Sequence, residues 1–571
     1  MSGKIERYRA HAYPVPETML AWQMTGAGFE NVGERGAAVR VKTPRPRPHE
    51  LLCRVDAVGL CFSDVKLILA GNNHPRIKGR DLKKNPTRGG HELSLTVAEV
   101  GEAERATYKV GERYIIQSDI YCKGRGMAFG YVFPGGMSEY TIIPEEALHG
   151  DEGSYLIPLR EGGLSYAEAA LVEPWACVEA AYRIRARTSP REGGRALVVG
   201  PAGRPPFEGL ERSGEVKTLE SPDPDAIAAL ARTGGAGERV EALFTDPSEQ
   251  AGFDDIVLAG PAAASRPVVE AALGALRRGG ILCLLGRGEF PHEVTVDVGR
   301  VHYQDIRIVA GDTIPLAYAA NTRQDLLPGG AVHMSGAAGP MGQMHVQRAV
   351  EHDRPPRLVA VSDLADDRLA YTVGRVERLA RSRGVEIVSL NPKRFPGPRE
   401  FEEALVRTTG GRGFDDVVLC APVGALVASA VRQAAEGCVV NIFAGVALGT
   451  TAVLDLDAIA KKRVRIVGSS GSRLADMQYV ASRAESGHLA TGVSAGAIGG
   501  CAQMLEGLIA LKEGRFPGKI VIYPAVASFP LTAVGEIASR LPRVGALLGP
   551  GGVWTKQAEE AFLEETLPAR A

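Results

Sequence analysis

The pattern of hydrophobic and polar positions changes near residue 165 and divides the chain into two kinds of structure. Before it, short apolar runs separated by Gly/Pro turns, such as 51–58 and 112–117, predict an all-β unit with few helices. After it, helical spacing first appears over 166–170, and short apolar strands then alternate with helical stretches. Strands that alternate with helices favour a parallel sheet covered on both faces.

The alternation of strands and helices occurs twice along the chain. Three segments recur in the same order at offsets of 161, 157 and 158 residues: Phe-Asp-Asp at 253–255 and 414–416, the apolar runs 280–286 and 437–443, and the strands 306–309 and 464–467. Three ordered matches at nearly one offset indicate two tandem copies of one α/β unit, over about 190–320 and 328–490.

The second copy opens with the parts of a dinucleotide site. Residues 332–342 have the pattern of a strand, a Gly-rich turn and the start of a helix. The turn contains Gly336, Gly339, Met341 and Gly342. Asp363 ends the next strand, 27 residues after the first glycine. Glycines let the backbone approach a pyrophosphate, the helix N-terminus faces its charge, and the acid accepts from the ribose hydroxyls. We expect NAD(H) here; the alternative is a close-packed turn without a ligand.

The first copy lacks these parts. Its turn is Gly200-Pro201-Ala202-Gly203-Arg204-Pro205-Pro206. Proline has no backbone N–H, so this turn is poorly suited to hold a phosphate. The copy is also about 25 residues shorter between its first glycine and the Phe-Asp-Asp run. We expect it to be degenerate and to bind no dinucleotide.

Three segments of the N-terminal half carry possible metal ligands. They are Cys61-Phe62-Ser63-Asp64, Gly90-His91-Glu92 and Glu173-Pro174-Trp175. Cysteine, histidine and glutamate are all zinc ligands, and a site with a carboxylate leaves room for an exchangeable water or substrate oxygen. Each residue alone would be an ordinary core side chain, so the prediction depends on their order and on the α/β unit downstream.

With these motifs the chain resembles the zinc-dependent medium-chain dehydrogenase/reductase family, in particular its polyol and sorbitol dehydrogenase branch and the sorbose-phosphate reductases. The resemblance covers about 18–185 and 328–524, so the first α/β copy is an extra unit in the family plan. It implies an α/β fold with an N-terminal GroES-like β domain and two tandem Rossmann-type, doubly wound parallel-sheet units. The expected domains are 1–185 (catalytic zinc domain), 190–320 (degenerate Rossmann-like unit), 328–490 (NAD-binding Rossmann unit), 491–525 (return segment to the catalytic domain) and 526–571 (C-terminal extension).

The resemblance also implies residue roles. Cys61 and His91 would be direct zinc ligands, and Glu92 and Glu173 would be ligands or nearby carboxylates that exchange with water. Asp64 would orient the ring of His91, and Ser63 would relay the alcohol proton. These two are the expected catalytic residues. Where some relatives carry a structural zinc this chain has only Cys122, so we expect one catalytic zinc and no structural zinc.

Composition and charge exclude several classes of partner and of protein. With 66 Lys and Arg against 67 Asp and Glu, the chain has no charge excess that would favour nucleic acid or an anionic membrane. Eight cysteines without a CxxC pair support no disulfide framework. The N-terminus has no apolar core of a secretory signal, so we expect a cytoplasmic protein with a small-molecule partner. We also expect either a homo-oligomer or pairing of the two Rossmann units within one chain.

The expected function is a zinc- and NAD(H)-dependent oxidoreductase acting on an alcohol or ketone of a polyol, sugar or sugar phosphate. The alternative is a redox-neutral sugar isomerase or epimerase with a retained NAD(H). A basic loop precedes His91 and carries Arg76, Lys78, Arg80, Lys83, Lys84 and Arg88 against Asp81. It is either a solvated surface loop or a handle for a substrate phosphate.

Overall fold

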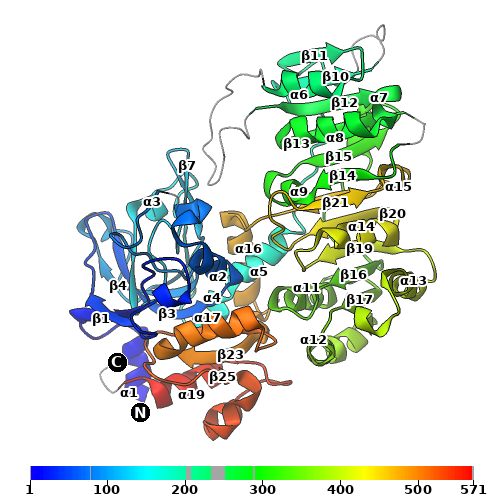
Figure 1. The fold of residues 1–571 in the computed structure, drawn as a ribbon. Helices are drawn as coiled ribbons and strands as arrows, with labels where there is room; N and C mark the ends of the chain where they lie inside the picture. The colour runs from blue at the N-terminus through cyan, green and yellow to red at the C-terminus, as the bar shows by residue number, and fades with distance from the viewer. Residues whose placement is uncertain (1, 78, 201–207, 233–250, 287–289, 569–571) are drawn as a thin grey trace. The chain divides into compact units, whose positions relative to one another are not determined.

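The structure is a computed structural model that describes residues 2–77, 79–200, 208–232, 251–286 and 290–568 (Figure 1). The described residues form two compact units. Unit 1 contains 2–179 and 471–568, and unit 2 contains those between 180 and 470. Unit 1 therefore combines the N-terminal β region with the C-terminal part of the chain.

Unit 1 is built on an eight-stranded sheet. Along the sheet the strands are β25 (Thr532–Ala533), β23 (Ala495–Gly500), β24 (Lys519–Tyr523), β3 (Leu51–Gly59), β4 (Glu92–Val100), β5 (Arg113–Ile116) and β9 (Leu156–Pro158), and β8 (Tyr140–Ile143) also pairs with β3. Two hairpin-like pairs are added, β1 (Thr18–Ala21) with β2 (Val39–Lys42), and β6 (Asp119–Cys122) with β7 (Arg125–Ala128). Residues 491–525 thus supply β23 and β24 to the sheet of the N-terminal domain.

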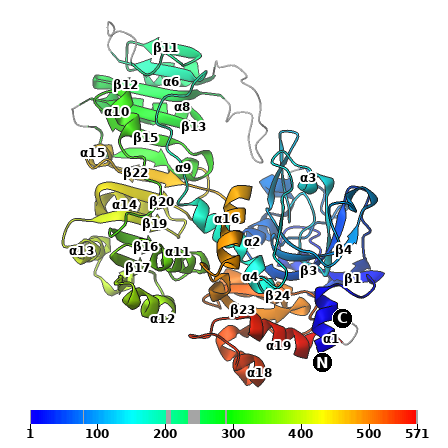
Figure 2. The same ribbon diagram turned by 180° about the vertical axis from the view of Figure 1, so that it is seen from behind.

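Unit 1 also contains helices, some of which pack against this sheet. They are α1 (Ser2–Arg9), α2 (Phe62–Ala70), α3 (Glu145–Leu148), α4 (Tyr166–Ala170), α5 (Val172–Ala180), α16 (Leu474–Glu485), α17 (Met504–Glu513), α18 (Pro542–Gly545) and α19 (Lys556–Thr566). The C-terminal extension docks on unit 1 through Trp554, which is fully buried and donates from Nε1 to the Tyr523 hydroxyl at 2.9 Å. Residues 532–539 of the extension form β25 and the 3-10 helix η9 (Val534–Ser539). In both ribbon views α1 lies beside α19 (Figures 1 and 2).

Unit 2 contains two parallel sheets. The first has the order β11 (Glu215–Leu219), β10 (Arg195–Val199), β12 (Phe253–Ala259), β13 (Leu276–Leu285), β15 (Arg307–Gly311). The second has the order β18 (Glu386–Leu390), β17 (Leu358–Ser362), β16 (Ala331–Ser335), β19 (Phe414–Leu419), β20 (Ala434–Ile442), β22 (Arg465–Gly468). Their helices are α6 (Pro224–Arg232), α7 (Pro261–Ala264), α8 (Arg266–Ala275), α9 (Val298–Gln304) and α10 (Ile314–Ala319) in the first copy, and α11 (Pro340–Glu351), α12 (Asp366–Ser382), α13 (Pro398–Thr408), α14 (Gly424–Gln433) and α15 (Leu456–Lys461) in the second. Two tandem doubly wound units and the β domain confirm the expected fold class.

The repeat extends to details of the backbone and to one side chain. The pairing of β12 with β13 is irregular between Phe253 and Asp255, and the pairing of β19 with β20 is irregular at the equivalent residues. Arg187 donates to the carbonyls of Asp254 and Gly279 at 3.0 and 3.3 Å. Arg323 makes the same two bonds in the second copy, to the carbonyls of Asp415 and Gly437 at 2.6 and 3.2 Å. Each arginine lies eight residues before the first strand of its copy, but the two are 136 residues apart, whereas the matched sequence segments are 157–161 residues apart, so the repeat pattern did not reveal it.

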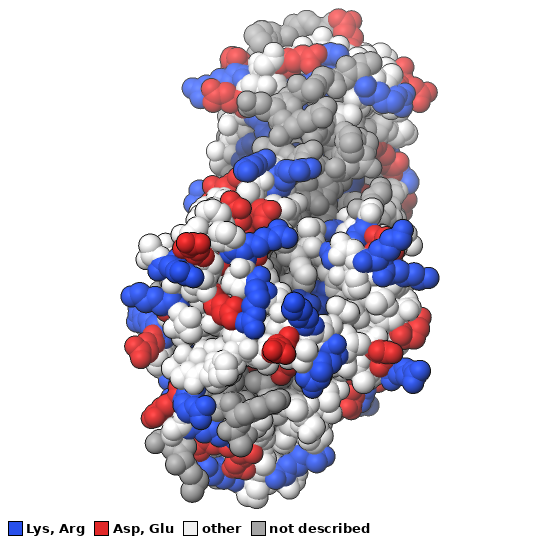
Figure 3. Space-filling model, turned by 90° about the vertical axis from the view of Figure 1, so that its left-hand side faces the viewer, with Lys and Arg blue, Asp and Glu red and all other residues white. Residues whose placement is uncertain are grey.

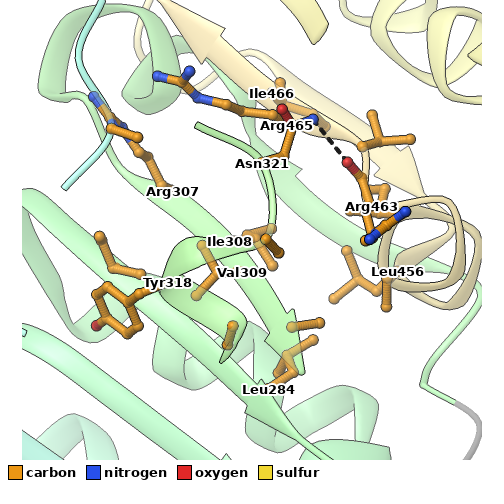
Figure 4. A pocket seen from close by; sticks show the side chains of 18 of the residues that line it. Leu284, Arg307, Ile308, Val309, Tyr318, Asn321, Leu456, Arg463, Arg465 and Ile466 are labelled. Atoms are coloured by element: carbon orange, nitrogen blue, oxygen red, sulfur yellow. Dashed lines mark hydrogen bonds between the residues drawn. The ribbon is translucent and has the colours of Figure 1, made fainter. Parts of the chain in front are cut away.

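The two copies are joined to each other by a pair of short strands. β14 (Val294–Asp297) of the first copy pairs antiparallel with β21 (Thr451–Leu454) of the second. Beside this pair, β15, α10, β22 and α15 line a crevice of about 50 Å³ with largely apolar walls (Figure 4). At its rim Asn321 Nδ2 donates to the Arg463 carbonyl at 2.9 Å. The seam between the copies is therefore a packed interface within one chain.

Within the described residues, no helix is both long enough and apolar enough to cross a membrane. On the face drawn in Figure 3, basic and acidic side chains are intermingled, without a patch of one sign. The turn of the first copy, 201–207, lies outside the described residues, as does Lys78 of the basic loop.

Candidate catalytic site

Antiparallel pairing of β3 with β4 brings the first two sequence motifs together. Gly59 at the end of β3 pairs with Glu92 at the start of β4, so the residues just beyond each end are neighbours. A Cβ at Gly59 would lie 2.2 Å from Glu92 Oε2, which explains why this position needs glycine. Cys61 follows β3 as the N-cap of α2, and His91 precedes β4.

Cys61, His91 and Glu92 form a compact donor set. One ligand atom from each of the three lies within 4.8 Å of the others. His91 and Glu92 are buried, and Cys61 is partly exposed. Ser63 Oγ lies 3.3 Å from His91 Nε2, so a hydroxyl stands beside the set. A thiol, an imidazole and a carboxylate at this spacing match the ligand types and the spacing of a zinc site.

Asp64 connects the two motifs through hydrogen bonds to their backbones. Its two carboxylate oxygens accept from Cys61 N at 3.1 Å and from Gly90 N at 2.9 Å, which connects the two motifs. Oδ1 also lies 3.6 Å from His91 Nδ1. Burial lowers the pKa of His91, but the Asp64 carboxylate raises it more, so the pKa stands well above its usual range. Asp64 therefore presents Nε2, and not Nδ1, to the donor set.

Glu92 has a buried partner that the sequence analysis did not identify. Lys519, at the start of β24, donates to Glu92 Oε1 at 2.5 Å. The Lys519 and Glu92 side chains are 4% and 0% exposed. The other carboxylate oxygen, Oε2, is buried and has no hydrogen-bond partner among the described residues. The two residues are 427 positions apart, so no local pattern could have linked them.

Glu173 stands near the donor set but is not one of its three members. It lies on α5, is 7% exposed, and accepts from Cys177 Sγ at 3.7 Å. Burial raises the pKa of Glu173 to about 7; His91 opposes this rise and Glu92 adds to it. The carboxyl group can therefore hold or release a proton near neutral pH.

The second α/β copy of unit 2 forms the expected glycine turn. Gly336 follows β16 with φ +74°, a conformation that favours glycine. A Cβ at Gly342 would meet the Gly336 carbonyl at 2.5 Å, so this glycine serves close helix–strand packing. A Cβ at Gly339 would meet no atom closer than 3.8 Å, which leaves the backbone open to a ligand. Met341 lies in the first turn of α11 and is partly exposed.

Asp363 lies at the end of β17, directly beside this turn. Its carboxylate accepts from Ala338 N at 3.0 Å and from Leu364 N at 2.8 Å. Arg368, on α12, donates from Nη2 to the Ala338 carbonyl at 3.1 Å. The structure thus brings the acid and the glycine turn together, and adds a cation that the sequence analysis did not single out.

Comparison with known proteins gives the following matches. Residues 47–150 match the family described as the alcohol dehydrogenase GroES-like domain. The chain is 24% identical to the uncharacterized protein YggP of Escherichia coli and 22% identical to mannitol-1-phosphate 5-dehydrogenase of Aliivibrio fischeri, each over 545 residues, 93% of this chain and 96% of the relative. A solved structure, a putative zinc-binding dehydrogenase from Sinorhizobium meliloti bound to NADP, has a TM-score of 0.50 at 16% identity and covers 89% of this chain and 100% of that chain. Both sequence relatives extend across most of the chain and therefore across its tandem units.

Proposed function

We propose that this chain, which belongs to the medium-chain dehydrogenase family, is a zinc-dependent oxidoreductase that transfers a hydride between NAD(H) and an alcohol or ketone of a polyol, sugar or sugar phosphate. The observation that carries the proposal is the donor set of Cys61, His91 and Glu92, held by Asp64. The mannitol-phosphate relative supports a polyol or sugar phosphate as the substrate class.

The residues fit one zinc ion. Cys61 Sγ, His91 Nε2 and a carboxylate would hold it, and Glu92 Oε2 is a buried oxygen without a hydrogen-bond partner among the described residues. Zinc would act as a Lewis acid on the substrate oxygen while nicotinamide exchanges the hydride. Glu173 is the second available carboxylate, and its raised pKa suits a group that exchanges with water.

The chain's own residues move the proton and order the site. The Ser63 hydroxyl lies beside His91 Nε2 and can take the substrate's hydroxyl proton and pass it outward. Asp64 fixes the His91 ring through its own bonds to Cys61 N and Gly90 N. Lys519 forms a buried ion pair with Glu92 and so supplies the counter-charge of this carboxylate.

The glycine turn of the second α/β copy would hold the cofactor, with the pyrophosphate against the open backbone at Gly339 and the N-terminus of α11. Asp363 favours NAD(H) over NADP(H), since a carboxylate repels a 2′-phosphate. The first copy would have a structural role. Its strand β14 covers β21 of the cofactor-binding copy within the same chain, which would leave this edge closed to a second molecule.

The test is a spectrophotometric assay of NADH at 340 nm with polyol, ketose and ketose-phosphate substrates. The zinc content of the same protein is measured at the same time. We expect turnover that a chelator abolishes, and loss of both zinc and turnover in His91→Ala. The exposed His488 provides the matched control, and His488→Ala should keep both. Zinc-loaded protein with tightly retained NAD(H) and no net NADH consumption would instead indicate the redox-neutral isomerase.

A further inference from the structure

We propose that unit 1 has a second divalent-metal site, formed by His49, Glu104 and His149 and separate from the Cys61 cluster. The three residues come from three segments of the chain. His49 lies in the loop before β3, Glu104 ends the 3-10 turn η4 (Glu102–Glu104), and His149 follows α3. The sequence alone shows only isolated histidines and an acid, because 55 and 45 residues separate each histidine from Glu104.

Both imidazoles contact the same carboxylate oxygen. His149 Nε2 lies 2.8 Å and His49 Nδ1 3.3 Å from Glu104 Oε1. One ligand atom of each residue lies within 4.8 Å of the other two. The two rings meet edge to face, at 81°, with centroids 6.3 Å apart. Two ring nitrogens and a carboxylate oxygen therefore face one small volume from three directions.

The carboxylate at the centre of this cluster is buried. Glu104 is only 3% exposed, and its ion-pair partners among the described residues are the two histidines. A divalent ion between the three donors would be held by a buried carboxylate and two imidazoles.

The donor set also defines the class of ion. Two imidazoles and one carboxylate on the same side are ligands for Zn²⁺, Ni²⁺, Cu²⁺ or Fe²⁺, and unsuitable for Ca²⁺ or Mg²⁺, which prefer oxygen. The side chains of His49 and His149 are 54% and 53% exposed, so an ion can enter and keep water ligands. Such an ion would tie the loop before β3, η4 and the end of α3 together. It would also be a second metal per chain, against the expectation of a single zinc.

The experiment titrates chelator-stripped protein with Zn²⁺ against a chromophoric competitor. It uses a Cys61→Ser background, so that the proposed catalytic zinc is removed first. We expect about two equivalents in the unmodified chain and one in Cys61→Ser. His49→Ala or His149→Ala in the same background should weaken the remaining site at least 100-fold and abolish Zn²⁺-induced thermal stabilisation. His488→Ala in that background is the control, and metal-free unfolding confirms that each variant is folded.

The outcomes separate the two proposals. If Cys61→Ser/His149→Ala still binds as much Zn²⁺ as Cys61→Ser, or if Cys61→Ser binds none, the second site is refuted. If Cys61→Ser keeps both equivalents, the proposed catalytic zinc fails while the second site stands. Unmodified affinity in Cys61→Ser/His488→Ala shows that the loss is specific to the cluster.

Discussion

Replacement of Lys519 by methionine tests the electrostatic design of the catalytic site. The ammonium lies 2.5 Å from Glu92 Oε1, and both side chains are almost completely buried. Methionine keeps the length of the stem but removes the charge, so Glu92 is left as a buried carboxylate without its counter-ion. At an effective dielectric constant of ~20, two unit charges at this separation attract by about 6–7 kcal/mol.

Part of that attraction is offset, because methionine no longer requires the burial of an ammonium. Loss of one partner of a buried pair typically costs about 3–5 kcal/mol. We therefore expect Lys519→Met to destabilise metal-free unit 1 by this amount. A bound zinc ion near Glu92 would replace the missing positive charge, so the same substitution should cost clearly less in the zinc-loaded protein.

Hydrogen exchange of the β3, β4 and β24 amides measures this effect in the intact chain, in which a single unfolding transition is not expected. A loss of 3–5 kcal/mol corresponds to exchange roughly 150- to 5,000-fold faster. Lys42→Met, at an exposed position at the end of β2, is the control and should change exchange little. A cost below about 1 kcal/mol in the metal-free protein would refute the charge argument.

Three further predictions concern other parts of the chain. Burial raises the pKa of Glu559 to about 7, above its value in the unfolded chain. The stability of unit 1 should therefore fall as the pH rises from about 4.5 to 7. The substitution Glu559→Gln should make the stability less dependent on pH in unfolding measurements over this range. Asp363→Ala removes a carboxylate that accepts from Ala338 N and should weaken NADH binding about 10- to 100-fold in a fluorescence titration; unchanged affinity would move the cofactor site elsewhere. Replacement of the exposed Lys83 and Lys84 together by alanine should raise KM for phosphorylated substrates only. An equal rise in KM for unphosphorylated substrates would show that the loop does not bind the phosphate.

The sequence predicts most of the fold because its signals are local. Apolar runs and Gly/Pro turns set the strands of unit 1, and the repeated Phe-Asp-Asp segments mark equivalent strands β12 and β19. The candidate site was harder to predict from the sequence. Cys61 and His91 can be named from their motifs, but their proximity depends on the β3–β4 register. Lys519 could not be found, because its role depends on β24 returning from the far end of the chain to pair with β3.

We infer a structural role for the first copy from the pair of strands that joins the tandem copies. An exposed sheet edge invites pairing with another chain. Here β14 of the first copy pairs with β21 of the second. Arg187 and Arg323, which precede the first strand of each copy, donate hydrogen bonds to backbone carbonyls of their own copy. We therefore expect substitutions in β14 to affect stability and oligomeric state before they affect cofactor affinity.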